Sequence, residues 1–399
     1  MGPLEGVRVL DLTWFHQGGY STVILADLGA EIIKVERPGV GDPGRQIGRF
    51  VKDGATIVPY FIAHDRGKKS ITVDLQHPEG KALIERLVPT VDVLVHNFRP
   101  GVMERLGLAY EDLRPLNPGL IYASASAYGE RGPLREQPGF DIVGQARGGL
   151  MSVTGTEESG PLPAGAMVAD HTGAMFLAQG ITAALYHKAR TGEGQALDVS
   201  LYGTVMCLQS WEINQYSITG NLPPKSGRGH QLNRGLWGSF QCADGKWLVL
   251  AGMGGERFNR FVELAGLKER LESDPALSTP EGRMRDRDRL WRVVEEGMRS
   301  RPRDEWLRLF AKHDIIVAPV QDYAEVLEDE QAWANDYLVR VEHPEAGELR
   351  IVGTPIHMSG TPAGNFALPP ELGQHTEEVL LATGFTWEDL TRLREAGAI

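Results

Sequence analysis

Short apolar segments alternate with helical segments between residues 7 and 126, and this alternation restricts the fold more than any other feature of the chain. Glu31–Glu36 has the apolar run of a buried strand, and Pro78–Leu87 has the spacing of a helix. Strands separated by helices of this length form βαβ units, whose parallel strands share one sheet and bind ligands beyond their carboxyl ends. The expected strands are Val7–Leu12, Glu31–Glu36, Ser70–Leu75, Val91–Val95 and Leu120–Ser126, and the expected helices are Ser21–Leu28, Pro78–Leu87, a pair within Met103–Leu116, and His171–Arg190.

The composition and the predicted pattern of elements change after Leu201, which predicts a second, smaller α+β domain. Residues 220–238 are rich in Gly, Pro, Asn and Arg, and a hairpin around Asp244-Gly245 is expected within Phe240–Leu250. Charged helical segments and a short strand at Ile315–Val320 follow. The predicted division is a large domain over 1–200, a linker over 201–224, a small domain over 225–325, and a segment over 326–399 that returns to the large domain because it is too short to fold alone.

Composition excludes several classes of function. The 399 residues carry a net charge of −12, which argues against a nucleic-acid binder with a broad basic surface. The two cysteines, Cys207 and Cys242, provide neither a disulfide framework nor a cysteine-rich metal site. The chain shows no apolar signal region and no apolar run long enough to span a bilayer, so we expect a cytoplasmic protein without a membrane partner.

Asp170 stands between a small-residue segment, 163–169, and the apolar helical run His171–Arg190. Lys188, Arg190 and Gly192 are typical of the end of that helix. We therefore expect Asp170 to be the N-cap, with an ionised carboxylate that accepts from free backbone N–H groups. Cap preference alone would make the role of Asp170 structural, and the adjacent His171 is expected to point elsewhere because neighbouring helical residues face different directions.

Basic residues gather near the ends of three predicted strands. Arg37 follows one strand, Lys68 and Lys69 precede another, and Arg99 and Arg105 follow a third. Any one of them alone would be read as a solvated side chain. Three clusters in one sheet predict a site for an anion with several phosphates. Residues 39–44 match the letters G-x-G-x-x-G, but no apolar helix follows them, so a turn is expected there.

Several long motifs, in order over nearly the whole chain, resemble the class III CoA-transferase family, of the formyl-CoA transferase and carnitine CoA-transferase type. They include LEGVRVLDLT, DRGKKSITVDL, VHNFRPGVMERLGL, YASASAYGERGP, TGEGQALDVSLY and LGQHTEEVL. The family also includes the α-methylacyl-CoA racemases. The resemblance implies a Rossmann-like large domain made from both chain ends, a smaller domain between them, and two subunits interlocked in a homodimer.

The resemblance also implies the site residues and the reaction. Asp170 matches the nucleophile, and Phe140 and Asp141 match a pair that lies near it. The first loop departs from the usual family pattern, because His16-Gln17-Gly18-Gly19 replaces an apolar residue followed by Ala, Gly and Pro. Coenzyme A and the acids would be substrates and products, with no tightly bound cofactor and no metal. The implied CoA contacts are His16, Gln17, Arg37, Lys68, Lys69, Asn97, Arg99, Met103 and Arg105.

In a CoA-transferase the carboxylate of Asp170 would attack an acyl-CoA, and CoA would pass through an aspartyl thioester to a free acid. Two alternatives stay open. An acyl-CoA racemase needs two acid–base groups near the α-carbon, and this chain has Phe140 where racemases have a histidine. A CoA-binding protein without activity would use Asp170 only as a cap and form no covalent intermediate. The sequence does not indicate which acids are donor and acceptor.

Overall fold

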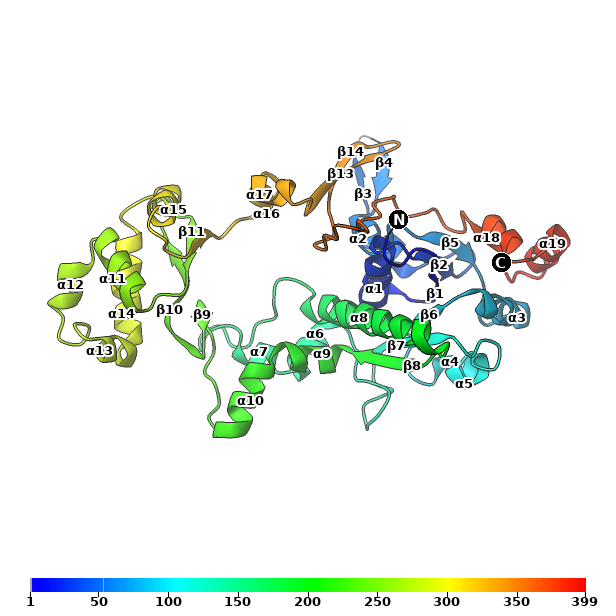
Figure 1. Ribbon diagram of the computed structural model, residues 1–399, viewed down its shortest axis with the longest axis horizontal. Coiled ribbons are helices and arrows are strands. Elements are labelled where there is room, and N and C mark those ends of the chain that lie inside the picture. Colours follow the sequence, from blue (N-terminus) through cyan, green and yellow to red (C-terminus); the bar gives the residue numbers. More distant parts are fainter. Residues whose placement is uncertain (1, 53) are drawn as a thin grey trace. The chain divides into compact units, whose positions relative to one another are not determined.

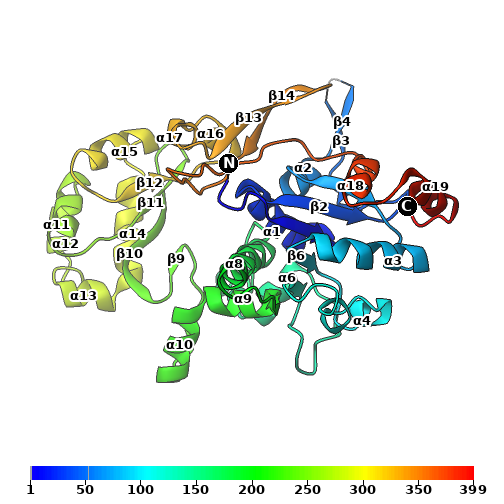
Figure 2. The ribbon, with the colours of Figure 1, turned by 45° about the vertical axis from the view of Figure 1, so that its right-hand side comes forward.

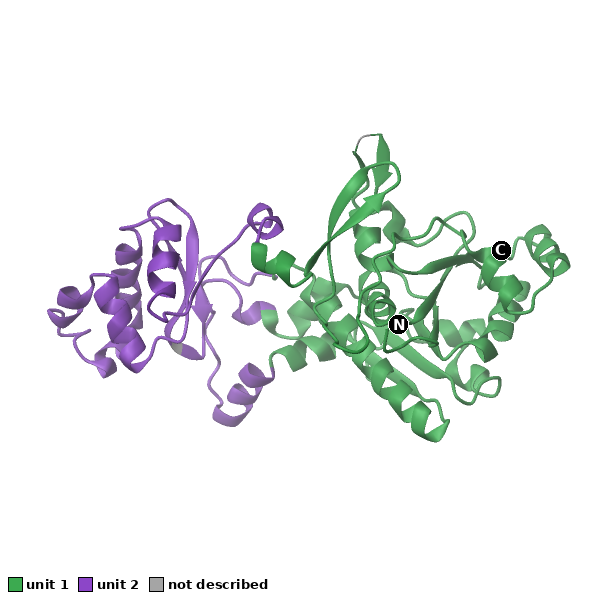
Figure 3. Ribbon diagram, turned by 45° about the horizontal axis from the view of Figure 1, so that its top comes forward, with its two compact units in different colours: residues 1–150, 164–209, 330–399 green, residues 151–163, 210–329 purple. Residues whose placement is uncertain are grey.

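The computed structural model describes residues 2–52 and 54–399. The chain divides into two compact units, which are coloured separately in Figure 3. Unit 1 comprises residues 1–150, 164–209 and 330–399, and unit 2 comprises residues 151–163 and 210–329. Helix α7 (Leu150–Val153) lies where the chain first passes from unit 1 to unit 2.

Unit 1 is built on a six-stranded parallel sheet with the order β5-β2-β1-β6-β7-β8 (Figure 1). This is the Rossmann order, in which the chain builds outward from β1 in one direction and then in the other. The carboxyl ends of β1 and β6 flank the point of reversal, where such sheets bind ligands. The predicted parallel α/β sheet is therefore confirmed. Its strands are β1 (Arg8–Asp11), β2 (Glu31–Glu36), β5 (Lys69–Thr72), β6 (Val93–His96), β7 (Ile121–Ser126) and β8 (Ala196–Ser200).

Successive residues of the central strands face opposite sides of the sheet, and each side has its own apolar core. Val9 and Ile32 contribute to the core beneath α1 (Phe15–Asp27) and α8 (Val168–Thr191). Leu10 and Ile33 contribute to the core on the other side, together with residues of α3 (Pro78–Leu87), α18 (Thr376–Ala382) and α19 (Trp387–Glu395).

The C-terminal segment returns to the first sheet. His375 donates its backbone N–H to Ser70, and Val379 and Leu380 are buried in the same core as β5. Figures 1 and 2 both show α19 beside α3, where Arg86 pairs with Asp389. Both ends of the chain thus build unit 1. Its smaller elements are η1 (Pro43–Gln46), β3 (Phe50–Lys52), β4 (Ala55–Ile57), α2 (Pro59–Asp65), η2 (Val88–Thr90), α4 (Val102–Leu106), α5 (Tyr110–Leu113), α6 (Asp141–Arg147), α9 (Leu201–Leu208), α17 (Glu330–Ala334), β13 (Leu338–His343) and β14 (Gly347–Val352).

Unit 2 contains an antiparallel sheet with the order β12-β11-β10-β9. The predicted hairpin is confirmed, since Gln241 pairs with Trp247 across Asp244-Gly245. Phe240, Phe261, Trp306 and Phe310 are buried in the core of this unit. Its elements are α10 (Ser210–Thr219), β9 (Gly229–His230), β10 (Asn233–Gln241), β11 (Trp247–Leu250), α11 (Gly255–Leu264), α12 (Lys268–Glu272), α13 (Pro280–Arg285), α14 (Arg287–Met298), α15 (Arg303–Ala311), β12 (Val317–Pro319) and α16 (Tyr323–Leu327).

Two expectations about element bounds were wrong. The expected linker 201–224 contains the helices α9 and α10. Leu201 and Val205 of α9 are buried with Ala169, which holds α9 to unit 1. Helix α1 begins at Phe15 rather than at Ser21, although glycine usually disfavours helices. Gly18 allows this early start, since a Cβ atom there would lie 2.4 Å from the Cβ of Thr13. Among the described residues, no helix has the length and apolar character needed to cross a membrane.

Candidate active site

Asp170 is the third residue of α8, so the prediction that it caps this helix is wrong. The helix begins at Val168, and Asp141 at the start of α6 takes the capping role from outside the helix. One oxygen of Asp141 accepts from the backbone N–H groups of Ala169 and Asp170, at 2.7 and 3.0 Å. These N–H groups are therefore not available to the carboxylate of Asp170.

The carboxylate of Asp170 is enclosed, and no lysine or arginine among the described residues forms an ion pair with it. Its side chain is 15% exposed, and the nearest basic nitrogen is His16 Nδ1, 4.0 Å from Oδ2. Burial, together with the charge of Asp141, raises the pKa of Asp170 to about 7. The expectation of a firmly ionised cap is replaced by a carboxyl group that titrates near neutral pH. Such a group in an enclosed site is typical of a catalytic residue.

The family resemblance set Phe140 and Asp141 near Asp170. Asp141 is the first residue of α6, and Phe140 is its N-cap residue. Asp141 is 3% exposed and also accepts from Gln145, whose carbonyl oxygen accepts from the backbone N–H of Ala164 at 2.9 Å. Asp141 and Gln145 thus fix the chain that leads into α8. Phe140 is 68% exposed, and its ring meets that of Phe15 edge to face with 6.2 Å between centroids.

The segment after β1 brings His16 close to Asp170 and Gln17 against α8. It starts with Phe15 at a φ of 60°, a left-handed conformation that is strained for a bulky residue. The amide of Gln17 lies against α8, since a Cβ atom at Gly173 would be 2.5 Å from Gln17 Nε2. That buried nitrogen has no hydrogen-bond partner among the described residues. Backbone strain and an unsatisfied buried donor are typical of a functional site.

A buried ion-pair network holds this segment at both ends. Lys34 donates to the carbonyl oxygen of Thr13 at 2.9 Å, and Lys68 donates to that of Gly19 at 3.0 Å. Lys34 pairs with Asp42 and Asp65, and Lys68 pairs with Asp11 and Asp65. The ammonium of Lys68 therefore uses its three N–H groups within the protein. It has none left for a phosphate, contrary to the predicted CoA contact.

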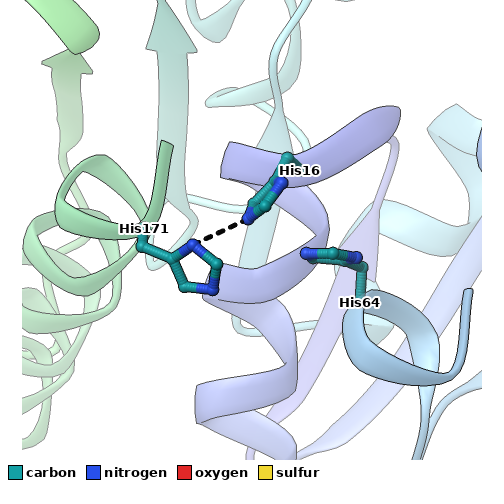
Figure 4. A group of neighbouring side chains, drawn as sticks. All are labelled: His16, His64 and His171. Carbon is teal, nitrogen blue, oxygen red and sulfur yellow. Dashed lines mark hydrogen bonds between the residues drawn. The ribbon is translucent and has the colours of Figure 1, made fainter. Parts of the chain in front are cut away.

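Three histidines converge, as Figure 4 shows, and one of them, His16, is the neighbour of Asp170 described above. His16 comes from α1, His64 from α2 and His171 from α8. The rings of His16 and His64 lie 3.9 Å apart between centroids. His171 does reach the site, because its Nδ1 lies 2.8 Å from Nε2 of His16. The sequence singled out neither His64 nor Tyr60 of the same helix; the only signal was a histidine four residues before Lys68 in a segment without a predicted element.

The proton positions on His16 and His171 follow from their neighbours. His171 Nδ1 also lies 3.2 Å from the carbonyl oxygen of Met167, which can only accept. We therefore assign the proton to His171 Nδ1 and let His16 Nε2 accept it. A neutral His16 then carries its proton on Nδ1, the nitrogen that faces Asp170. Burial, with His64 and His171 nearby, lowers the pKa of His16 to about 2, so the ring is neutral at pH 7.

Among the described residues, the imidazoles of these three histidines are the group that could hold a metal ion. One nitrogen from each ring lies within 4.8 Å of the others. Burial lowers the pKa of His64 to about 4 and also lowers that of His171. Neutral imidazole is the form that ligates metals.

The basic residues predicted to bind CoA separate into two sets. Arg37 follows β2, Arg99 follows β6 and Arg105 lies in α4; all three are exposed and have no ion pair with a described residue. Strands β2 and β6 flank β1, so Arg37 and Arg99 follow strands roughly 10 Å apart at the same edge. Lys69 begins β5 and pairs with Glu31 and Glu378, so it points to the opposite edge of the sheet from Arg37.

Asn97 and Met103 have mainly structural contacts. Asn97 bonds through its side-chain amide to both the N–H and the carbonyl of Trp14, and thereby joins the loops after β6 and β1. Met103 is 2% exposed within the core beneath α3, so its side chain lies inside the protein rather than on the predicted CoA surface. The predicted CoA residues that remain open to a ligand at this edge are Arg37, Arg99 and Arg105.

Comparisons with known proteins agree with one another. A family model described as CoA-transferase family III matches residues 4–376. The succinyl-CoA–D-citramalate CoA-transferase of Chloroflexus aurantiacus is 36% identical over 393 residues, covering 98% of this chain and 97% of that protein. The acetyl-CoA:oxalate CoA-transferase of Acetobacter aceti is 35% identical over 360 residues, covering 90% of each. A CAIB/BAIF family protein from Brucella suis has a crystal structure that matches with a TM-score of 0.85 at 30% identity, covering 96% of this chain and 99% of that one.

Proposed function

This chain belongs to CoA-transferase family III, and we propose that it moves CoA from an acyl-CoA thioester to a free carboxylic acid through covalent adducts of Asp170. The observation that carries the proposal is the environment of this carboxyl group. It is 15% exposed, has no ion pair with a lysine or arginine in the described part of the chain, and has a pKa of about 7. An ionised fraction is therefore present at neutral pH, and the poorly solvated carboxylate can attack without a general base.

The reaction balances as a series of acyl transfers. Asp170 attacks the donor carbonyl, the C–S bond breaks, and CoA leaves as a thiolate from a mixed anhydride. The thiolate attacks the aspartyl carbonyl and releases the donor acid, which leaves an aspartyl-CoA thioester. The acceptor carboxylate attacks this thioester, and the thiolate then attacks the acceptor carbonyl of the new anhydride. Acceptor-CoA departs and Asp170 is restored.

Each attack develops negative charge on a carbonyl oxygen next to Asp170. His16 supports this step in our proposal, because it directs a neutral Nδ1–H toward Asp170 Oδ2 from 4.0 Å. Distances to catalytic donors in ligand-free proteins are often long and shorten when substrate binds. The exposed Arg37, Arg99 and Arg105 would bind the phosphates or the adenine of CoA at the edge where β1 and β6 end. We further propose an interlocked homodimer and a cytoplasmic location.

The test of this proposal is the conservative substitution Asp170→Asn, which keeps the size of the side chain but removes the nucleophile. We expect turnover to fall by at least about 10⁴-fold, since a covalent route loses its first step. The panel would use succinyl-CoA and acetyl-CoA as donors, with oxalate, malate and citramalate as acceptors. Glu193→Gln, on the exposed segment just after α8, is the matched control and should retain full activity. Turnover by Asp170→Asn close to that of the control would refute the role of Asp170.

An acyl-CoA racemase is not favoured. The sequence offered no second acid–base group for such a reaction. The structure does place other candidate groups at the site, because His16 lies beside Asp170 and His171 lies beside His16. However, a pKa of about 2 makes His16 a poor base for an α-proton. The relatives from Chloroflexus aurantiacus and Acetobacter aceti are both named as CoA-transferases.

A further inference from the structure

We propose that His16, His64 and His171 form a binding site for a first-row transition-metal ion of the Zn²⁺ and Co²⁺ class. The three ligating nitrogens would be Nε2 of His16, Nε2 of His64 and Nδ1 of His171. The inference goes beyond the transferase reaction, which needs no metal, and it does not rest on that reaction. It also goes beyond the sequence, which led us to expect no metal.

His64 carries the first part of the argument. Its Nδ1 lies 2.6 Å from the carbonyl oxygen of Tyr60, so that nitrogen holds the proton and donates it. Nε2 therefore presents a lone pair, and it is buried without a hydrogen-bond partner among the described residues. His64 itself is 4% exposed. A histidine that donates one nitrogen to a backbone carbonyl while the other faces an enclosed space has the arrangement of a metal ligand.

His16 and His171 provide the other two nitrogens. Nε2 of His16 and Nδ1 of His171 already approach each other to 2.8 Å. A metal ion there would take the place of the proton on His171 Nδ1, and that proton would move to Nε2 of the same ring, which keeps the imidazole neutral. The second nitrogen of His16 faces the carboxylate of Asp170, which is the arrangement of a carboxylate that orients a metal-binding histidine. Figure 4 shows His64 extending one ring nitrogen toward the pair formed by His16 and His171.

The spacing and the chemistry of these nitrogens select the kind of ion. One nitrogen from each ring lies within 4.8 Å of the others, whereas metal–nitrogen bonds of about 2.0–2.1 Å set tetrahedral ligands roughly 3.4 Å apart. Small rotations of the rings bring them to that separation. Imidazole suits Zn²⁺, Co²⁺, Ni²⁺ and Cu²⁺, and it does not suit Mg²⁺ or Ca²⁺. A dication here would also favour the ionised form of Asp170 and oppose the effect of burial.

The experiment titrates Co²⁺ into the chelator-treated, full-length protein and records the visible d–d bands. We expect one Co²⁺ per chain, bands typical of nitrogen ligands, and their loss when Zn²⁺ is added. His64→Gln should raise the Kd for Co²⁺ by about 100-fold or more, since loss of a ligand exceeds the cost of losing an outer hydrogen bond. His171→Gln, at a half-buried position, should do the same and serves if His64→Gln does not fold.

His187→Gln is the matched control, because His187 is an exposed histidine on the same helix. It should bind Co²⁺ like the unmodified protein. Absence of d–d bands in the unmodified protein at millimolar Co²⁺ would overturn the proposal. Bands that persist unchanged in His171→Gln, or that are lost equally in His187→Gln, would also overturn it.

Discussion

Two buried charged regions of unit 1 meet at residues 13–19, and they differ in how their charges are paired. In the lysine network, Lys34 and Lys68 each contact two carboxylates at 2.8 to 3.2 Å. Around Asp170 the neighbours are neutral imidazoles and a second acid, Asp141.

The two environments shift the pKa values of their carboxyl groups in opposite directions. Burial alone would raise the pKa of Asp11, but Lys68 and Lys34 lower it to about 2. Burial and Asp141 raise the pKa of Asp170 to about 7. Paired charges hold the backbone on both sides of His16, whereas the unpaired acid keeps its reactivity. In our proposal, the paired charges serve structure and Asp170 serves chemistry.

Breaking the paired region should give the largest loss of stability. Lys68→Met removes the cation between Asp11 and Asp65 and leaves two buried carboxylates with less compensation. We expect the free energy of unfolding to fall by about 3–5 kcal/mol, measured by urea denaturation. The neighbouring Lys69→Met is the control, since its partly exposed ion pairs should contribute only about 0–1 kcal/mol. Equal losses in the two variants would remove the distinction between the regions.

A substitution in the unpaired region should raise the free energy of unfolding rather than lower it. The pKa of Asp170 is raised from 3.8 to about 7 on folding, so the folded state holds its proton more tightly. The wild-type protein therefore loses stability as the pH rises from about 4 to about 7, and Asp170→Asn avoids this loss. At pH 8 we expect Asp170→Asn to be more stable by about 1–3 kcal/mol, with little difference near pH 4. A variant that is less stable at pH 8 would show that Asp170 is a paired, structural charge.

The smallest expected effect concerns the exposed arginines, which belong to neither buried region. Arg37→Ala and Arg105→Ala should each raise the Kd for CoA by about tenfold, or about 1.4 kcal/mol, without changing the melting temperature. Titration calorimetry measures the affinity. Arg114→Ala, another exposed arginine in unit 1, is the control. Unchanged affinity in both Arg37→Ala and Arg105→Ala would remove the proposed phosphate site.

Local patterns in the sequence predicted the sheet and its helices well. Glu31–Glu36 and Pro78–Leu87 have the predicted bounds, because apolar periodicity and a helix-starting proline are local signals. The hairpin of unit 2 follows from an equally local pattern.

Local sequence patterns could not predict which groups surround the charged residues. Lys68 reaches Asp11 across 57 positions of sequence, and nothing near Lys68 distinguishes a buried cation from a ligand-binding one. Asp170 looked like a cap because a small-residue segment precedes it, yet Asp141, 29 positions earlier, takes the N–H groups. His16 and His171 are 155 positions apart. Contacts of this kind depend on the closed fold rather than on local spacing.

The most direct test of the central claim is to look for the covalent adduct. Protein would be mixed with an acyl-CoA and no acceptor in deuterated solvent and quenched rapidly. The protein would then be treated with hydroxylamine and mapped by mass spectrometry, and the acyl group would be recovered and analysed for deuterium. We expect a hydroxamate at Asp170 and no deuterium in the recovered acyl group. Labelling should strengthen as the pH rises toward 7, because the ionised carboxylate is the nucleophile. Deuterium at the α-carbon without a label on Asp170, or a label confined to Cys207 or Cys242, would contradict the account.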